Sequence, residues 1–125
     1  MERTGSRKER RKSPRFLLDL PLEYRVTNVP FAHGGVVVNA SEIGLLISSV
    51  KDMPIGTELH VSVLFPEGYK LTNFRVVAQV IWKDLHWEED WEGYQYGLRF
   101  TQILEEDRDK LKQLLNGQIQ FDEAP

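Results

Sequence analysis

The chain of 125 residues contains no cysteine. Disulfides, zinc–thiolate sites and thiol nucleophiles are therefore excluded. Long apolar runs are also missing. No stretch approaches the roughly 20 apolar residues of a membrane span, and the basic N-terminus lacks the apolar run of a signal peptide. We expect a cytoplasmic protein that makes no membrane contact.

Signatures of catalysis are scarce too. No Gly-rich phosphate loop precedes a helix, and no histidine–carboxylate group accompanies a nucleophile. His86 lies among carboxylates in residues 84–92, but it has no second histidine at metal-ligand spacing. An acidic hairpin loop is therefore the better interpretation than a metal site. Trp87 and Trp91 in this loop could mark a docking patch for an effector protein. The sequence predicts a protein that is not an enzyme and holds no metal.

What the sequence does have is an uneven distribution of charge. Its formal net charge is −3, yet residues 1–16 carry seven Lys and Arg against Glu2 and Glu9, a net +5, which leaves −8 for the remainder. A basic arm on an acidic body favours a specific small anionic ligand. Long nucleic acid is disfavoured, because the body would repel the phosphates that the arm attracts. A solvated basic tail is the simplest alternative.

The length fits one domain with its own hydrophobic core. We expect residues 1–15 to form a basic N-terminal arm, mobile without ligand because it has almost no apolar residues. Residues 16–120 are expected to form the folded body, and residues 121–125 a short tail.

The body contains six strand-like runs, most of which alternate apolar and polar residues with a period of two, while the second is β-branched and the third is continuously apolar. The runs lie at 20–26, 34–39, 45–50, 59–65, 73–83 and 94–100. The period then becomes helical. Leu104, Leu111 and Leu115 share one face with Leu114 beside it, acidic residues 105–107 occupy the first turn, and Gly117 is the expected stop. This order predicts an all-β fold with a C-terminal helix, namely a small six-stranded antiparallel β-barrel.

One aromatic residue of the long run at 73–83 has two interpretations. The even positions from Phe74 to Val80 would share one face, and Trp82 continues their phase. That phase predicts a core position for Trp82. The functional alternative is an aromatic neighbour for a bound base.

Two polar motifs lie near these runs, one before the first run and one at the end of the second. Arg10, Arg11 and Arg15 belong to the arm, and the planar guanidinium suits phosphate oxygens and the O6/N7 edge of guanine. Asn39, Ser41 and Gly44 follow the second run. Asn and Ser bond free backbone groups at a turn, and Gly44 permits a positive φ or a close ligand contact. An ordinary Asx turn between two strands explains the second motif equally well when it is considered alone.

Taken together, the motifs resemble the PilZ family, bacterial receptors for the second messenger cyclic di-GMP. The resemblance rests on Arg-Arg-x-x-x-Arg at Arg10, Arg11 and Arg15, on Asn39-x-Ser41-x-x-Gly44, and on the Gly-Leu-Arg-Phe run at 97–100 before the helix. It covers nearly the whole chain. Asn39 stands where many relatives have Asp, and an amide offers one acceptor oxygen where a carboxylate offers two.

The resemblance implies how such a receptor works. One guanine would sit on the outer face of the barrel near Asn39, Ser41 and Gly44, while the arginine arm folds over the ligand. The first arginine, Arg10, is associated with an intercalated ligand dimer, which implies two molecules of cyclic di-GMP per protomer. Ligand binding would change the conformation of the arm and signal to a partner, whose identity stays open together with the oligomeric state.

Two other functions remain open. The same arm could serve a nucleic-acid-binding barrel, which would bind oligonucleotides in a salt-dependent way and be indifferent to Ser41 and Gly44. A PilZ-like protein adaptor without ligand binding is the other, although it has no evident need for the arginine motif.

Overall fold

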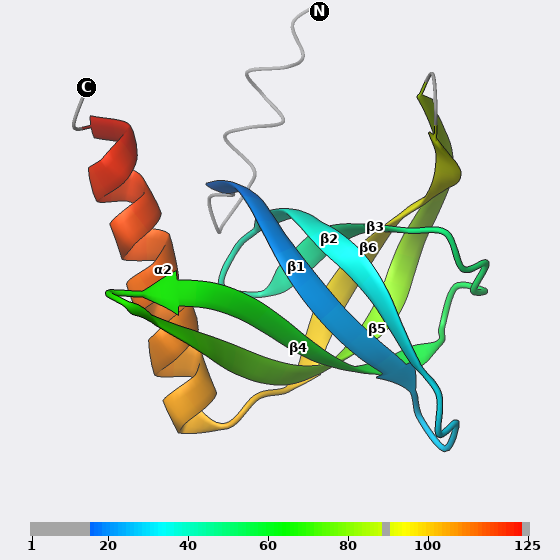
Figure 1. Ribbon diagram of the computed structural model, residues 1–125. Coiled ribbons are helices and arrows are strands. Elements are labelled where there is room, and N and C mark those ends of the chain that lie inside the picture. Colours follow the sequence, from blue (N-terminus) through cyan, green and yellow to red (C-terminus); the bar gives the residue numbers. More distant parts are fainter. Residues whose placement is uncertain (1–15, 89–90, 124–125) are drawn as a thin grey trace, which may run out of the picture.

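The computed structural model describes residues 16–88 and 91–123, with the side chains of residues 16–87 and 92–117. Within these residues, six strands and one helix follow one another, and Figure 1 shows their arrangement. They are β1 (Phe16–Val26), β2 (Ala32–Ala40), β3 (Gly44–Ser49), β4 (Glu58–Glu67), β5 (Lys70–Glu88), β6 (Trp91–Gln102) and α2 (Glu105–Glu123).

The six strands form a closed antiparallel barrel in the order β1-β2-β3-β6-β5-β4. The first strand closes it, because β1 pairs with β2 on one side and with β4 on the other. Closure pairs the edges that an open sheet would expose. The predicted six-stranded barrel with a C-terminal helix is confirmed.

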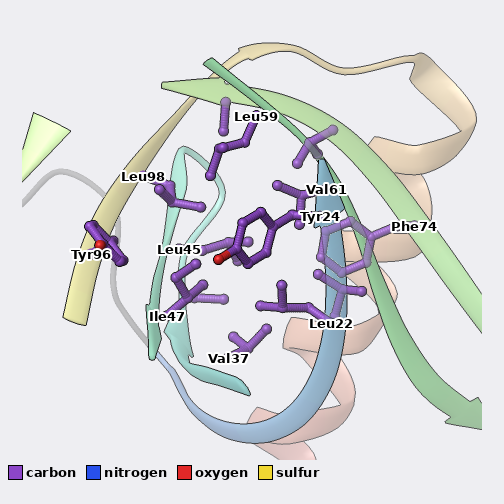
Figure 2. Packing of buried hydrophobic residues seen from close by; sticks show 14 of the residues in the cluster. Leu22, Tyr24, Val37, Leu45, Ile47, Leu59, Val61, Phe74, Tyr96 and Leu98 are labelled. Atoms are coloured by element: carbon purple, nitrogen blue, oxygen red, sulfur yellow. The ribbon is translucent and has the colours of Figure 1, made fainter. Parts of the chain in front are cut away.

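The barrel interior is filled by the inward-facing positions of the alternating strands. Tyr24 lies near the centre, surrounded by aliphatic side chains from several strands (Figure 2). On β4, Leu59, Val61, Val63 and Phe65 are all buried, which confirms the period of two that predicted them.

Two buried tyrosines add hydrogen bonds to this core. The Tyr24 hydroxyl lies 2.6 Å from the Ser49 hydroxyl. The Tyr96 hydroxyl donates to the Lys51 carbonyl at 2.5 Å and accepts from the Met53 N–H at 2.8 Å. Burial raises the pKa of Tyr96 to about 12, and burial also raises that of Tyr24, although its bond to Ser49 opposes the shift. The two hydrogen bonds of the Tyr96 hydroxyl connect the loop between β3 and β4 to the barrel.

Helix α2 packs beside β5, where β5 extends past its pairing with β6. That pairing begins at Val77. Two residues earlier, the Arg75 N–H donates to the buried Asp107 carboxylate at 3.0 Å, and the Lys110 ammonium donates to the Asn73 carbonyl at 3.1 Å. Side chains of α2 thus form hydrogen bonds with backbone groups of β5 at positions where β6 no longer pairs with β5.

The ends of α2 differ from the prediction. Leu111 and Leu115 are buried as expected, but Leu104 is 65% exposed. Leu104 precedes the helix, and its carbonyl accepts the Arg108 N–H at 2.9 Å, so it stands at the start of the first turn. Gly117 does not end the helix, which continues to Glu123. It is not among the residues with positive φ, the conformation that a glycine cap requires.

The predicted core position of Trp82 is also wrong. The pairing of β5 with β6 shifts register between Val80 and Trp82. Such a bulge inserts an extra residue and reverses the phase of the positions that follow. Val80 is fully buried, whereas Trp82 is 45% exposed on the outside of the barrel.

Candidate functional site

A tight turn joins β2 to β3 and contains Ser41. The Ser41 N–H donates to the Gly44 carbonyl at 3.0 Å, and the Ser41 hydroxyl accepts the Ile43 N–H at 3.2 Å. The Phe100 N–H of β6 donates to the Ile43 carbonyl at 2.9 Å. Ser41 itself is 1% exposed. Its hydroxyl therefore shapes the turn from within, as Ser does in local side-chain–backbone turns.

Gly44 is explained by a neighbouring strand. A Cβ atom added to Gly44 would lie 2.1 Å from the Leu98 carbonyl oxygen. The residue is not among those with positive φ. Glycine is therefore required here because the backbones of β3 and β6 approach closely, and neither a left-handed conformation nor a ligand is needed to account for it.

The outside of the barrel beside this turn carries a row of cross-strand neighbours. Leu17 pairs with Asn39, Asn39 with Leu46, Leu46 with Gly97, and Gly97 with Trp82. Directly paired residues lie on the same side of a sheet. None of the five is buried. We call these residues the outer row; it consists of Leu17, Asn39, Leu46, Gly97 and Trp82.

Trp82 is placed over Gly97. A Cβ atom built on Gly97 would lie 3.1 Å from the Trp82 Cβ and 3.7 Å from its Cε3. The indole thus occupies space that only glycine leaves open on β6, on the side that leads toward Leu46. The outer row contains no charged side chain, and one amide, that of Asn39, accompanies its apolar groups. A surface of this kind suits the flat face of an aromatic base.

A further cation, Arg99, lies on the same side of the barrel. The sequence motifs did not assign Arg99 to the site. It pairs directly with Gly44, next to the turn, and its side chain is exposed. Strand alternation could have indicated it, since Arg99 is two residues from Gly97 and therefore points the same way. An arginine at this position is suited to phosphate oxygens.

The predicted arm residues Arg10, Arg11 and Arg15 lie outside the described residues. The place where the arm joins the barrel is nevertheless fixed, because Phe16 pairs with Ala40, one residue before Ser41. Cα atoms of such antiparallel pairs are about 5 Å apart. The structure therefore brings Asn39, Ser41, Gly44 and Trp82 to one side of the barrel, with Phe16, the first described residue, beside the turn.

Other features of the described residues lie elsewhere. A groove of about 650 Å³ between α2 and the outside of β1, β4 and β5 shares no residue with the outer row. Among the described residues no group of three or more His, Asp or Glu could hold a metal ion. The described helix is not apolar enough to span a membrane.

Comparison with known families gives a match over most of the chain. The model of the PilZ domain matches residues 9–117. This range includes both polar motifs and all six strands. No curated protein sequence matches the chain.

Solved structures of similar fold are distant in sequence. The inhibitor of motility MotI/DgrA of Bacillus subtilis has a TM-score of 0.73 at 17% identity, over 93% of this chain and 54% of that one. The PilZ domain of YcgR from Escherichia coli, solved with c-di-GMP, has a TM-score of 0.71 at 12% identity, over 90% and 94%. The MrkH–c-di-GMP complex of K. pneumonia has a TM-score of 0.70 at 16% identity, over 92% and 54%. The chain thus spans about half the length of MotI and MrkH.

Proposed function

The chain belongs to the PilZ domain family, and from this premise we propose that it is a non-enzymatic receptor for cyclic di-GMP. The observation that carries the proposal is the register of β1. It places Phe16, the residue that follows Arg15 in the sequence, opposite Ala40, beside the Ser41 turn and next to Leu17 of the outer row. Two similar structures, those of YcgR and MrkH, are complexes with c-di-GMP, which supports the same ligand here.

The outer row supplies the surface on which one guanine rests. An amide such as that of Asn39 is chemically suited to the edge of a base, and Trp82 supplies an aromatic face. Ser41 acts by holding the turn that follows Asn39, since its buried hydroxyl bonds the Ile43 N–H. Gly44 acts by letting β3 lie close to β6.

The arm supplies the charge. The two phosphates of cyclic di-GMP carry two negative charges, and Arg11 and Arg15 contact the O6/N7 edge of a guanine or a phosphate oxygen. Arg10 binds the second molecule of an intercalated pair, so two ligands bind each protomer. Arg99 adds a cation from the barrel side.

Binding converts a mobile arm into an ordered one. Ordering costs conformational entropy, which the charge-assisted hydrogen bonds of the three arginines offset. The ordered arm then presents a changed surface to a partner protein, which is how the ligand signal is passed on.

Calorimetric titration of arm variants tests this proposal. Arg11→Ala and Arg15→Ala should each weaken binding of cyclic di-GMP by about 1–3 kcal/mol, while the unfolding transition stays that of the wild type. Lys8→Ala is the matched control, because it removes one arm charge outside the arginine motif and should change affinity less than either. Unchanged affinity in both arginine variants would remove the arm from the site.

A further inference from the structure

The hairpin formed by the ends of β5 and β6 reaches away from the barrel (Figure 1). Pairing of the two strands continues through Leu85↔Tyr94 and Trp87↔Glu92 to Glu88↔Trp91. The neighbours of this hairpin stop earlier. Pairing of β3 with β6 ends at Tyr94, and pairing of β4 with β5 ends at Gln79. The proposed ligand site makes no use of this part of the chain.

One face of the hairpin carries large apolar side chains that are open to solvent. Alternation places Leu85 and Trp87 on the same side of β5, together with their partners Tyr94 and Glu92. Leu85 is 48% exposed and Trp87 is 66% exposed. We call these four residues, Leu85, Trp87, Glu92 and Tyr94, the hairpin face.

Closer to the barrel, the same side of β5 already holds a cation. The Lys83 ammonium lies 5.0 Å from the centre of the Tyr94 ring and forms an ion pair with Asp52. An aromatic ring and a carboxylate thus bind one positive charge together. Four residues further along β5, Trp87 and Glu92 repeat this combination, and in the described part of the chain no cation lies over the Trp87 ring.

The outer edge of β5 is open next to these groups. In the described residues no strand pairs with β5 beyond Gln79 on the side of β4. The Leu85 N–H donates instead to the Asp84 side chain at 2.9 Å. An edge of this kind can accept an additional extended strand from another chain. Residues 84–92 contain five Asp and Glu and no Lys or Arg, so the charge of the hairpin is negative.

We infer that the hairpin face is a docking surface for an extended basic segment of a partner protein. The segment lies along the open edge of β5, places an Arg or Lys over the Trp87 ring toward the Glu92 carboxylate, and packs an apolar side chain two residues away against Leu85. The spacing follows from the period of two in a strand. The inference does not depend on which nucleotide the outer row binds.

Selection from a random linear peptide library on the immobilised full-length protein tests this inference. We expect enriched peptides to carry Arg or Lys two residues from an apolar residue. Trp87→Ala and Glu92→Gln should each weaken binding of a synthesised enriched peptide at least tenfold. Tyr69→Ala is the matched control, because it removes a fully exposed aromatic side chain from the tip of the other long hairpin, and it should leave peptide affinity unchanged.

Three results would overturn the inference. One is a library that yields no binder, or only acidic or wholly apolar peptides. Another is binding that Trp87→Ala and Glu92→Gln leave intact. The third is self-association of the wild-type protein in sedimentation that Trp87→Ala abolishes, because the surface would then serve a second copy of the chain. Cyclic di-GMP affinity measured on Trp87→Ala separates the two proposals, since it should equal that of the wild type.

Discussion

Replacement of Trp82 by alanine is the perturbation that bears most directly on the outer row. The indole is 45% exposed and lies against Gly97 on the surface that we assign to the ligand. Removing it takes away the aromatic face but leaves Asn39, the turn and the arm in place. The barrel should survive, because the side chain is about half buried and its loss costs on the order of 1 kcal/mol of folding free energy.

The expected loss of affinity follows from stacking. A base stacked on an aromatic side chain contributes about 1–3 kcal/mol by alanine substitution. Since 1.36 kcal/mol corresponds to a factor of ten, Kd for cyclic di-GMP should rise by about 5-fold to 150-fold. Trp82→Phe keeps a smaller ring over Gly97 and should recover part of the loss.

Isothermal titration calorimetry of folded variants measures this effect. Trp87→Ala is the matched control, because Trp87 is on the same strand and 66% exposed but lies outside the outer row. It should bind as the wild type does. Equal affinity in Trp82→Ala and wild type, with both proteins folded, would refute the assignment of the ligand to this surface.

Three further predictions concern the groups that hold the fold and the turn. Asp107→Ala should lower the free energy of unfolding, measured in denaturant, by about 1.5–3 kcal/mol, because the Arg75 N–H loses its carboxylate partner. Asp109→Ala, the control at an exposed position of the same helix, should change the free energy of unfolding little. Ser41→Ala should weaken cyclic di-GMP by only about 1 kcal/mol, because the lost bond to the Ile43 N–H is a neutral one; a loss as large as that of Arg11→Ala would contradict this. The pKa of Tyr96 is raised to about 12 from 10.0, so the neutral hydroxyl contributes its full stabilisation below pH 10 and loses it as the pH rises toward 12. Tyr96→Phe should remove this alkaline loss of stability in unfolding measured against pH. A Tyr96 hydroxyl that ionises near pH 10 would contradict this prediction.

The fold was largely predictable from the sequence because its strands alternate cleanly. The inward positions of β4 are all buried, and the order of strands and helix is the one expected. Trp82 could not be placed in this way. A bulge adds one residue to β5, so the period of two fails beyond Val80. The composition of the strand does not indicate this bulge.

The sequence offers candidate residues for the site, and their place at the ligand stays a prediction. The local role of two of these residues comes only from the structure: Ser41 bonds within the turn, and Gly44 makes room for the Leu98 carbonyl. The role of Gly44 depends on the register of β3 with β6, which pairs it with Arg99, 55 residues further along the chain, and the motif itself does not indicate that register. Arg99 was missed for the same reason.

Titration of the full-length protein with cyclic di-GMP and with cyclic di-AMP tests the central claim most directly. Adenine lacks the O6 acceptor that the arginine fork reads in guanine. We predict saturable binding of cyclic di-GMP at micromolar concentration or below, with two molecules per protomer and much weaker binding of the adenine compound. A folded protein that takes up no cyclic di-GMP at micromolar concentrations, or that binds both dinucleotides equally, would contradict the account.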